Sequence, residues 1–369
     1  MQPPRDKVFA GPLVGLRVVE MAGLGPVTFT AMLLADMGAD VVRITRPAQQ
    51  EMEHGATLRG RVSMALDLRT DSGHRTALDL LEKADVLLEG FRPGVMERLG
   101  LGPTDVKAVR PQLVYGRMTG WGQSGPRAHT AGHDINYIAL TGALHAIGSA
   151  EPVVPLNLVG DYGGGALYLA MGVLAAVLHA RASGQGQVVD AAICDGTISL
   201  LSLMHGLHQV GRWKDARQTN TLDGAAPYYR CYRCLDGRFL AVGAIEPAFY
   251  ALLLQRLGLT NDPLFAQQND RNQWSAQTQA LQQVFATRSR DAWIEHFSGS
   301  DACVAPVNSL TESWSDPHLE VRKAFVELAG TRQPAPAPRF SGSPSMARLS
   351  ESVCDADQVL ARWTSEQKT

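Results

Sequence analysis

Two polar clusters interrupt an otherwise apolar region in the middle of the chain. The first covers residues 132–137 (GHDINY) and the second covers residues 157–161 (NLVGD). An ionisable side chain among small apolar residues needs a partner or a chemical function, because an uncompensated buried charge is costly. The imidazole of His133 and the carboxylate of Asp161 suit proton transfer, with an acid and a base facing one carbon. A lone histidine is more often structural than catalytic, and in this apolar setting residue types alone leave the role of His133 open.

The charge balance of the chain predicts a small-molecule ligand. The 369 residues include 34 Lys and Arg against 36 Asp and Glu, so neither sign is in excess to attract nucleic acid or an anionic membrane. Residues 1–7 show no apolar segment behind a basic start, which argues against a secretory signal and predicts a cytoplasmic protein. The longest apolar run, residues 163–178, is shorter than the ~20 residues of a membrane span and predicts a buried helix.

Five cysteines lie at positions 194, 231, 234, 303 and 354. Their odd number and wide spacing argue against a disulfide framework. The close pair Cys231 and Cys234 lacks the second Cys or His pair of a zinc site and the strand-to-helix context of a redox motif. We therefore expect strand residues at these positions and no metal site.

Strand and helix patterns alternate along much of the chain before residue 210. Strands are expected at 16–20, 41–44, 85–88, 113–115 and 187–192, and helices at 28–37, 71–81, 104–110, 163–181 and 195–210. Asp71 or Ser72 is expected to cap the second of these helices. This alternation predicts an α/β fold with a mainly parallel sheet.

The first expected strand is followed by a glycine-rich turn, residues 23–28 (GLGPVT). It resembles a dinucleotide-binding fingerprint, but it has Thr28 in place of the third glycine and a proline inside the loop. The turn is therefore weak evidence for a nicotinamide cofactor. It predicts a tight turn close to some ligand.

Composition changes after the last of these helices. Residues 211–226 are polar and predict an exposed linker. Residues 227–310 have their own strand and helix pattern, which predicts a second, smaller α+β domain. The proline-rich residues 334–338 predict a stiff return linker.

The chain resembles the family III CoA-transferase superfamily, and within it the α-methylacyl-CoA racemase branch, over nearly its whole length. The matching motifs are the two polar clusters, GLRVVE at 15–20, LADMGADVVR at 34–43, GQSGP at 122–126, GQGQVVD at 184–190, VGAIEP at 242–247 and GSDACVAPV at 299–307. The last two are more typical of racemases than of transferases.

This resemblance implies an interlocked homodimer of two-domain chains. Each chain would have a large Rossmann-like CoA-binding domain (1–210), a linker (211–226), a small domain (227–310), a return linker (311–338) and a C-terminal segment that rejoins the large domain (339–369). The active site would form between the large domain of one chain and the small domain of the other. Monomers would then be inactive.

The resemblance implies that a 2-methylacyl-CoA thioester loses its α-proton on one face and regains a proton on the other, through an enolate. His133 would take the proton from the S substrate and Asp161 from the R substrate. Glu246 of the partner chain would hydrogen-bond His133, and Asn157 would position Asp161. Backbone N–H groups at residues 161–164 are candidates to stabilise the enolate, because a helix start favours negative charge. The glycines there could instead only permit close helix packing.

The CoA moiety belongs to the substrate in this family, so no cofactor is expected. The residues that match substrate-binding or CoA-binding positions are Arg46, Leu66, Asp67, Leu68, Arg69, Arg92, Gly132, Asp134, Ile135, Asn136 and Tyr137. Arg59 and Arg61 could add phosphate contacts or be ordinary surface charges. Residues that could line an acyl pocket are Met204, Leu222 and Tyr228. Gly160 stands where relatives often have Ala, a departure that removes no catalytic group.

Two alternatives to a racemase of lipid metabolism are open at this point. A transferase of the same fold would use Asp161 as the nucleophile that attacks the thioester, and would not need a base at His133. A silent CoA-ester binding protein would be expected to lose His133 or Asp161. Because His133, Asp161 and Glu246 are all present, the sequence favours the isomerase.

Overall fold

The computed structural model describes residues 9–47, 55–352 and 356–365 of the chain. It divides into two compact units: a larger one, Met1–Gly142 with Pro155–Leu201 and His318–Thr369, and a smaller one, Ala143–Val154 with Ser202–Pro317. The smaller unit therefore includes 143–154 and 202–226, which the sequence assigned to the large domain and a linker. One cause is Arg217, whose guanidinium donates to the carbonyls of His145 at 2.9 Å and Ser149 at 3.0 Å.

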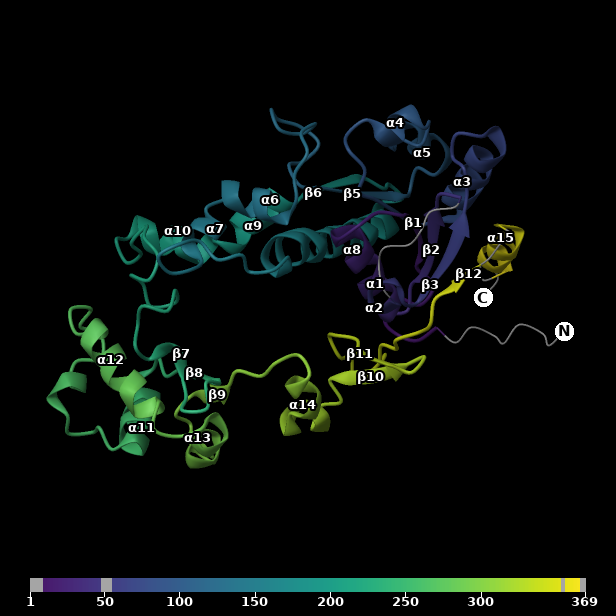
Figure 1. Cartoon of the computed structure of the whole chain (residues 1–369). Coiled ribbons are helices and arrows are strands. Elements are labelled where there is room, and N and C mark those ends of the chain that lie inside the picture. The colour runs from purple at the N-terminus through teal and green to yellow at the C-terminus, as the bar shows by residue number, and fades with distance from the viewer. Residues whose placement is uncertain (1–8, 48–54, 353–355, 366–369) are drawn as a thin grey trace. The chain divides into compact units, whose positions relative to one another are not determined.

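The larger unit is built on a parallel sheet of seven strands, as the sequence pattern predicted (Figure 1). The spatial order is β12 (Glu351–Ser352), β3 (Arg61–Ala65), β2 (Asp40–Thr45), β1 (Arg17–Met21), β4 (Val86–Glu89), β5 (Val114–Thr119) and β6 (Val188–Ala192). The sequence did not predict β3 or β12. Both lie on one side of β2, and each pairs with its neighbour in parallel.

Helices cover both faces of this sheet. They are α1 (Pro26–Asp36), α2 (Gly55–Leu58), α3 (Asp71–Lys83), α4 (Val95–Arg98), α5 (Pro103–Val109), α6 (Asp134–Leu140), the π-helix η1 (Leu158–Ala166), α8 (Leu167–Ser183), α9 (Ile193–Leu200) and α15 (Ala356–Ser365). Successive side chains of β1 pack on opposite faces of the sheet, because side chains alternate along a strand. Val18 lies in a core cluster with Leu169 of α8, and Val19 lies in another core cluster with Leu80 of α3.

Two predicted helix boundaries were wrong. The cap of α3 is Thr70, one residue before the expected Asp71, because its Oγ1 accepts a hydrogen bond from Gly73 N–H at 3.1 Å. The helix expected at 195–210 is two helices, α9 and α10 (Ser202–Gln209), which are separated by a turn residue at Leu201. The division between the two units falls at this break.

The smaller unit has a three-stranded antiparallel sheet in the order β7 (Tyr229–Arg233), β8 (Phe239–Gly243) and β9 (Val304–Pro306). Its helices are α7 (Ala143–Ala146), α10, α11 (Pro247–Leu257), η2 (Pro263–Phe265), α12 (Trp274–Phe285), α13 (Arg290–Phe297) and η3 (Glu312–Ser315). Tyr232 and Leu240 face a buried core, whereas Cys231 and Phe239 are exposed on the other face of the sheet. Cys231 is a strand residue, and Cys234 directly follows the strand.

The C-terminal segment returns to the larger unit. After α14 (Pro317–Val321) and the hairpin of β10 (Phe325–Leu328) and β11 (Thr331–Pro334), β12 joins the edge of the sheet and α15 packs beside α3. Trp363 is fully buried there, and its Nε1 donates to Asp40 Oδ2 at 2.7 Å. This hydrogen bond ties the end of the chain to the start of β2.

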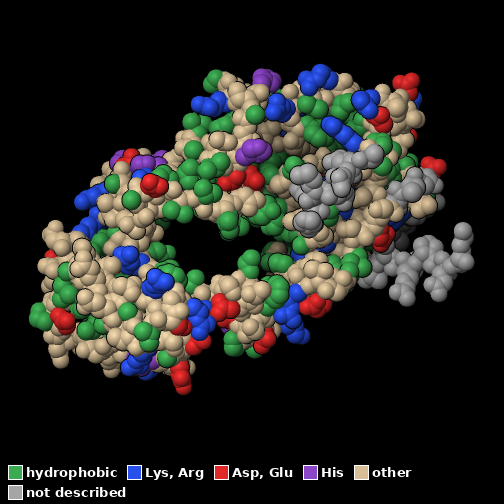
Figure 2. All heavy atoms as spheres, viewed as in Figure 1, with side chains coloured by type: hydrophobic (Ala, Val, Ile, Leu, Met, Phe, Trp, Pro, Cys, Tyr) green, Lys and Arg blue, Asp and Glu red, His purple; other side chains and the backbone are tan. Residues whose placement is uncertain are grey.

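The apolar run at 163–178 belongs to a longer helix than expected. Helices η1 and α8 are continuous over Leu158–Ser183, 26 residues that contain an 18-residue window with a mean hydropathy of 1.6, which by length and composition alone would suffice to span a membrane. Half of the 18-residue window that gives this value is buried in the protein, as in the core helix of a folded domain. On the face shown in Figure 2, basic and acidic side chains are interspersed.

Candidate functional site

The carboxylate of Asp161 lies on a rare type of helix. Residues Leu158–Ala166 form a π-helix, in which Tyr162 N–H donates to Asn157 O at 3.1 Å, five residues earlier. Such segments are uncommon and are frequent at functional sites. The side chain of Asn157 hydrogen-bonds the Asp161 carboxylate, because the two lie one turn apart on this helix. Asn157 is therefore placed to orient Asp161.

Asp161 also lies against the glycine-rich turn that follows β1. A Cβ built on Gly25 would lie 3.4 Å from Asp161 Oδ2, and Gly25 itself has a positive φ of 69°. Gly25 is the residue before α1, so the carboxylate faces the amino end of that helix. The turn that resembled a dinucleotide fingerprint thus contacts the carboxylate of the second polar cluster.

His133 occupies the residue before α6. Its backbone N–H donates to Asn136 Oδ1 at 3.0 Å, and its carbonyl accepts from Asn136 N–H at 2.8 Å. This reciprocal pair fixes the start of the helix and leaves the imidazole exposed. His133 lies near enough to Asp161 to affect the ionisation of that carboxylate. The structure therefore brings together the two groups that the sequence singled out.

Asp134 connects the two polar clusters. Its Oδ1 accepts the backbone N–H of Asp161 at 2.7 Å, and the N–H of Gly160 also donates to its carboxylate. A Cβ on Gly160 would lie only 2.3 Å from Asp134 Oδ1, so the departure from Ala at this position leaves room for the carboxylate. The carboxylate of Asp134 therefore fixes the start of α6 relative to the π-helix, which gives this side chain a positioning role.

The ionisation of Asp161 is perturbed. Burial raises the pKa of its carboxyl to about 6, and the nearby Asp134 carboxylate contributes to the rise. The hydrogen bond from Asn157 and the charge of His133 act in the opposite direction. A carboxyl group with a pKa near neutrality can both accept and return a proton at physiological pH, which is the property required of a reversible acid–base catalyst.

An aromatic cluster borders this acid–base pair. The Tyr137 hydroxyl donates to the carbonyl of Gly132, and its ring packs edge-on against Trp121 with centroids 4.7 Å apart. Burial, and then the Asp161 carboxylate, raise the pKa of Tyr137, while Arg92 acts in the opposite direction. Tyr137 therefore lies within electrostatic range of both Asp161 and Arg92.

Five of the residues predicted to bind CoA line one cavity. This cavity of about 350 Å³ is bordered by Arg46, Leu66, Asp67, Leu68 and Arg69, together with Met21, Ala22, Ile44, Thr45, Pro47, Phe91, Val95 and Leu99. Most of these residues end or follow the first four strands, so the cavity opens at the carboxyl edge of the parallel sheet. Ligands of open α/β folds bind at this edge. The sequence reasoning missed the apolar wall formed by Phe91, Val95 and Leu99.

The polar groups of this cavity are partly preorganised. Arg69 makes a bidentate contact with Asp67, with Nε and one terminal nitrogen each 2.9 Å from a carboxylate oxygen. This contact lowers the pKa of Asp67 to about 2, and the charge of Arg46 contributes. Ile135 and Arg92 are exposed in the same unit.

A buried ion network holds the loop that carries Phe91 and Arg92. Glu89 is fully buried and accepts from Arg117 Nε at 2.7 Å and from Phe91 N–H at 2.7 Å. The same guanidinium binds Glu97 of α4. Arg117 thereby joins β4, β5 and α4 behind the cavity, a role that the sequence analysis missed because each residue looked like an ordinary charge.

Arg59 and Arg61 are not surface charges. Arg59 is 3% exposed and Arg61 is 1% exposed. Arg59 pairs with Asp36 at 2.5 Å, and Arg61 pairs with Glu20 at 2.9 Å and donates to the carbonyl of Thr28. Their donors are used inside the protein, so neither of the two expected roles, phosphate contact or solvated charge, fits them.

The prediction that backbone N–H groups at residues 161–164 stabilise the enolate was also wrong in part. The N–H groups of Asp161 and Tyr162 are bonded to Asp134 and Asn157, so they are not available to a ligand. The packing interpretation applies to Gly164, because a Cβ there would lie 2.4 Å from Thr197 Oγ1.

Tyr228, suggested for the acyl pocket, is 2% exposed and belongs to the core of the smaller unit.

Glu246 lies in the smaller unit, directly before α11. It is exposed, and within the described residues its carboxylate makes no hydrogen bond and does not cap the helix. The nearby thiol of Cys303 has a pKa raised by burial first and by the charge of Glu246 second. The carboxylate is thus free to contact a group outside the smaller unit.

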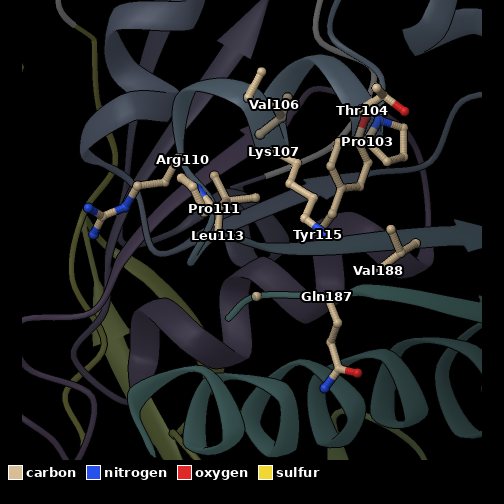
Figure 3. A pocket seen from close by; sticks show the side chains of 12 residues that line it. Pro103, Thr104, Val106, Lys107, Arg110, Pro111, Leu113, Tyr115, Gln187 and Val188 are labelled. Carbon is tan, nitrogen blue, oxygen red and sulfur yellow. The ribbon is translucent and has the colours of Figure 1, made fainter. Parts of the chain in front are cut away.

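A second cavity of the larger unit, about 420 Å³ in volume, lies at the opposite end of the strands (Figure 3). It is bordered by residues at the amino ends of β5 and β6, such as Leu113, Tyr115 and Val188, and by Val106 and Lys107 of α5. Its lining includes no histidine and no carboxylate. In the described part of the chain, no cluster of three or more His, Cys, Asp or Glu side chains could hold a metal ion.

The chain matches known proteins over nearly its whole length. Residues 13–353 match the model of the family described as CoA-transferase family III. The chain is 43% identical to the alpha-methylacyl-CoA racemase of Mus musculus and 42% identical to that of Homo sapiens, in each case over 90% of this chain and 88% of the relative. A solved CAIB/BAIF family protein from Brucella suis shares the fold, with a TM-score of 0.81 at 24% identity, over 96% of this chain and 100% of that chain.

Proposed function

This chain belongs to CoA-transferase family III, and we propose that it is an isomerase that epimerises 2-methylacyl-CoA thioesters. The observation that carries the proposal is the pairing of Asp161, with its pKa raised to about 6, and the exposed imidazole of His133. The two racemases to which this chain is 43% and 42% identical support the same reaction. We expect no cofactor, because CoA is part of the substrate.

In the proposed reaction, the α-carbon lies between the two groups. Asp161 as carboxylate takes the α-proton of the R substrate, the electron pair of the C–H bond moves into the thioester to form an enolate, and protonated His133 returns a proton to the opposite face. In the other direction, neutral His133 takes the proton of the S substrate and protonated Asp161 returns one. Each positioned group supplies about 10²- to 10⁴-fold in rate.

The enolate oxygen needs hydrogen-bond donors. The backbone N–H groups of Asp134 and Ile135, at the start of α6, have no acceptor within the described part of the chain. They follow His133 directly, so a thioester oxygen beside them would leave the α-carbon within reach of the imidazole. Fixed donors at a developing negative charge are usually a large part of catalysis.

The CoA moiety would occupy the cavity at the carboxyl ends of the strands. Its guanidinium groups at Arg46 and Arg69 suit phosphates, and its apolar wall at Phe91, Val95 and Leu99 suits the adenosine. Arg92 and Tyr137 would then lie between this cavity and the acid–base pair.

We further propose an interlocked homodimer in which Glu246 of the partner chain hydrogen-bonds His133. The carboxylate of Glu246 has no hydrogen-bond partner within the described residues, and it would fix the tautomer of the imidazole and raise its basicity. An exposed apolar stripe on α8 supports a second copy: Leu167, Met171 and Leu178 are 51%, 60% and 70% exposed. A stripe of this kind usually marks an interface. We propose a cytoplasmic enzyme without membrane insertion.

A chiral assay tests the proposed function. One enantiomer of a 2-methylacyl-CoA should be converted into a mixture of both by the purified protein, and the conversion should be lost in His133→Ala. In parallel, labelled free acid should not exchange into the CoA pool. Label exchange without epimerisation would contradict the proposal and identify a transferase that uses Asp161 as its nucleophile.

A further inference from the structure

The smaller unit contains a cationic cavity that the proposed reaction does not use. It has a volume of about 450 Å³ and is bordered by Lys214, Arg230 and Arg271. All of its lining residues belong to the smaller unit, whereas the residues proposed to bind CoA belong to the larger one. A volume of this size is within the range of small-molecule sites.

The smaller unit neutralises two of its arginines with carboxylates. Arg238 is held by Asp236, Asp291 and Glu312, and Arg290 by Asp291 and Glu312. By contrast, none of the three cations at the cavity forms an ion pair with any residue that the structure describes. The cavity therefore concentrates positive charge that the unit itself does not neutralise.

Arg230 supplies a second, independent observation that points to a ligand. Its Nε is buried and has no hydrogen-bond acceptor among the described atoms. A terminal nitrogen donates to Thr278 Oγ1 at 3.4 Å, and the guanidinium lies 5.7 Å from the centroid of the Tyr232 ring. A buried donor without an acceptor costs about 1–3 kcal/mol. An oxyanion in the cavity would remove this cost and the mutual repulsion of the cations together.

The walls of the cavity are fixed in place before any ligand binds. Asn220, which is 1% exposed, accepts the N–H of Lys214 at 2.8 Å and donates to its carbonyl at 2.9 Å. The guanidinium of Arg271, another lining residue, stacks on Trp274 with 5.5 Å to the ring centroid. The carboxylate of Asp223, which precedes the lining residues Gly224 and Ala225, accepts backbone N–H groups of its own loop at residues 219, 220 and 225.

We propose that this cavity binds the phosphate group of a small organic phosphate. Three cations favour a dianion over a singly charged carboxylate, and guanidinium groups match the oxygens of phosphate. The hydroxyl groups of Ser275 and Thr278 line the same cavity and can donate to the remaining oxygens. This inference is independent of the reaction that the protein catalyses.

Calorimetric titration of the full-length protein at low ionic strength tests the proposal. Inorganic phosphate and glycerol 3-phosphate are the probes, and chloride at matched ionic strength is the blank. Both probes should bind saturably, and glycerol 3-phosphate should bind more tightly, because the cavity is larger than one phosphate ion. Equal affinity for the two would reduce the site to one for free phosphate and would overturn the organic part of the proposal.

Variants identify the cavity as the site. Arg230→Gln should weaken binding by about 10-fold or more, because a lost charge-assisted hydrogen bond is worth about 1.5–3 kcal/mol. The double variant Lys214→Gln with Arg271→Gln changes two exposed side chains, so it keeps the test valid if Arg230→Gln does not fold. Arg233→Gln, on the same strand but outside the cavity, is the matched control. No saturable binding by the wild-type protein, or an equal loss in the control, would refute the proposal.

Discussion

Replacement of Asp134 by Asn tests whether this residue tunes the acid–base pair. The Asp134 carboxylate accepts the N–H of Asp161 at 2.7 Å, and an Asn side chain oxygen can keep that hydrogen bond while the charge is removed. The Asp134 charge helps to raise the pKa of Asp161 to about 6, second only to burial. The substitution should therefore lower the pKa of Asp161 without displacing it.

The size of the effect follows from the contact. With the hydrogen bond at 2.7 Å, the two carboxylates are separated by roughly 6 Å, which at an effective dielectric constant of about 20 corresponds to about 3 kcal/mol. Both groups are partly exposed, so solvent screening reduces the interaction to about half that value, or about one pKa unit. The expected shift is thus about one pH unit toward acid.

The assay is the pH dependence of kcat/KM for the R substrate, in which Asp161 must be ionised to accept the proton. The wild-type rate should fall as the pH drops through about 6, and the Asp134→Asn rate should fall about one unit lower. Asp105→Asn is the matched control, since Asp105 accepts a backbone N–H from Gly102 at 3.0 Å at the start of α5. An unchanged acid limb in folded Asp134→Asn would refute the reasoning.

Three further outcomes are expected. Because the pKa of Asp161 is raised in the folded protein, protonated Asp161 contributes stability below pH ~4, and this contribution is lost as the pH rises through about 6. In urea unfolding, Asp161→Asn should therefore be more stable than wild type at pH 8 by about 1–2 kcal/mol, after allowance for the partial exposure of Asp161. At pH 4 the two proteins should not differ. Equal differences at both pH values would contradict this. Arg46→Gln should raise KM for the CoA ester by about 10-fold with little change in kcat, because the lost contact is to a phosphate; a fall in kcat alone would argue against that contact. Glu246→Gln should lower kcat by about 10-fold or more in both directions while the dimer persists in sedimentation, and unchanged turnover would remove Glu246 from the site.

The regular part of the fold was predictable from the sequence, because β1, β2, β4 and β5 are short apolar runs between helical patterns. Strand β3 was missed because Arg61 and Ser63 break its apolar pattern. Arg61 can be buried there only because Glu20 of β1 lies 2.9 Å away, which is a contact between strands that no local pattern reveals. Strand β12 has two residues, too few for a pattern to detect.

The sequence singled out residues for the candidate site, but it did not predict their geometry. His133 and Asp161 stood out as ionisable groups in an apolar region, and the CoA residues were found by resemblance. Residues 161–164 were expected at a helix start, whereas Asp161 lies inside a π-helix that begins at Leu158 and is preceded by Asn157. The positioning role of Asp134 depends on the approach of α6 to that helix, a tertiary contact that spacing along the chain does not encode.

Exchange of the α-proton in deuterated water tests the central claim most directly. Wild-type protein should place deuterium at the α-carbon of both enantiomers of a 2-methylacyl-CoA. Asp161→Ala should retain exchange of the S substrate, where His133 is the base, and His133→Ala should retain exchange of the R substrate. No deuterium at the α-carbon with the folded wild-type protein, or loss of the same enantiomer's exchange in both variants, would contradict the assignment of the two groups to opposite faces of one carbon.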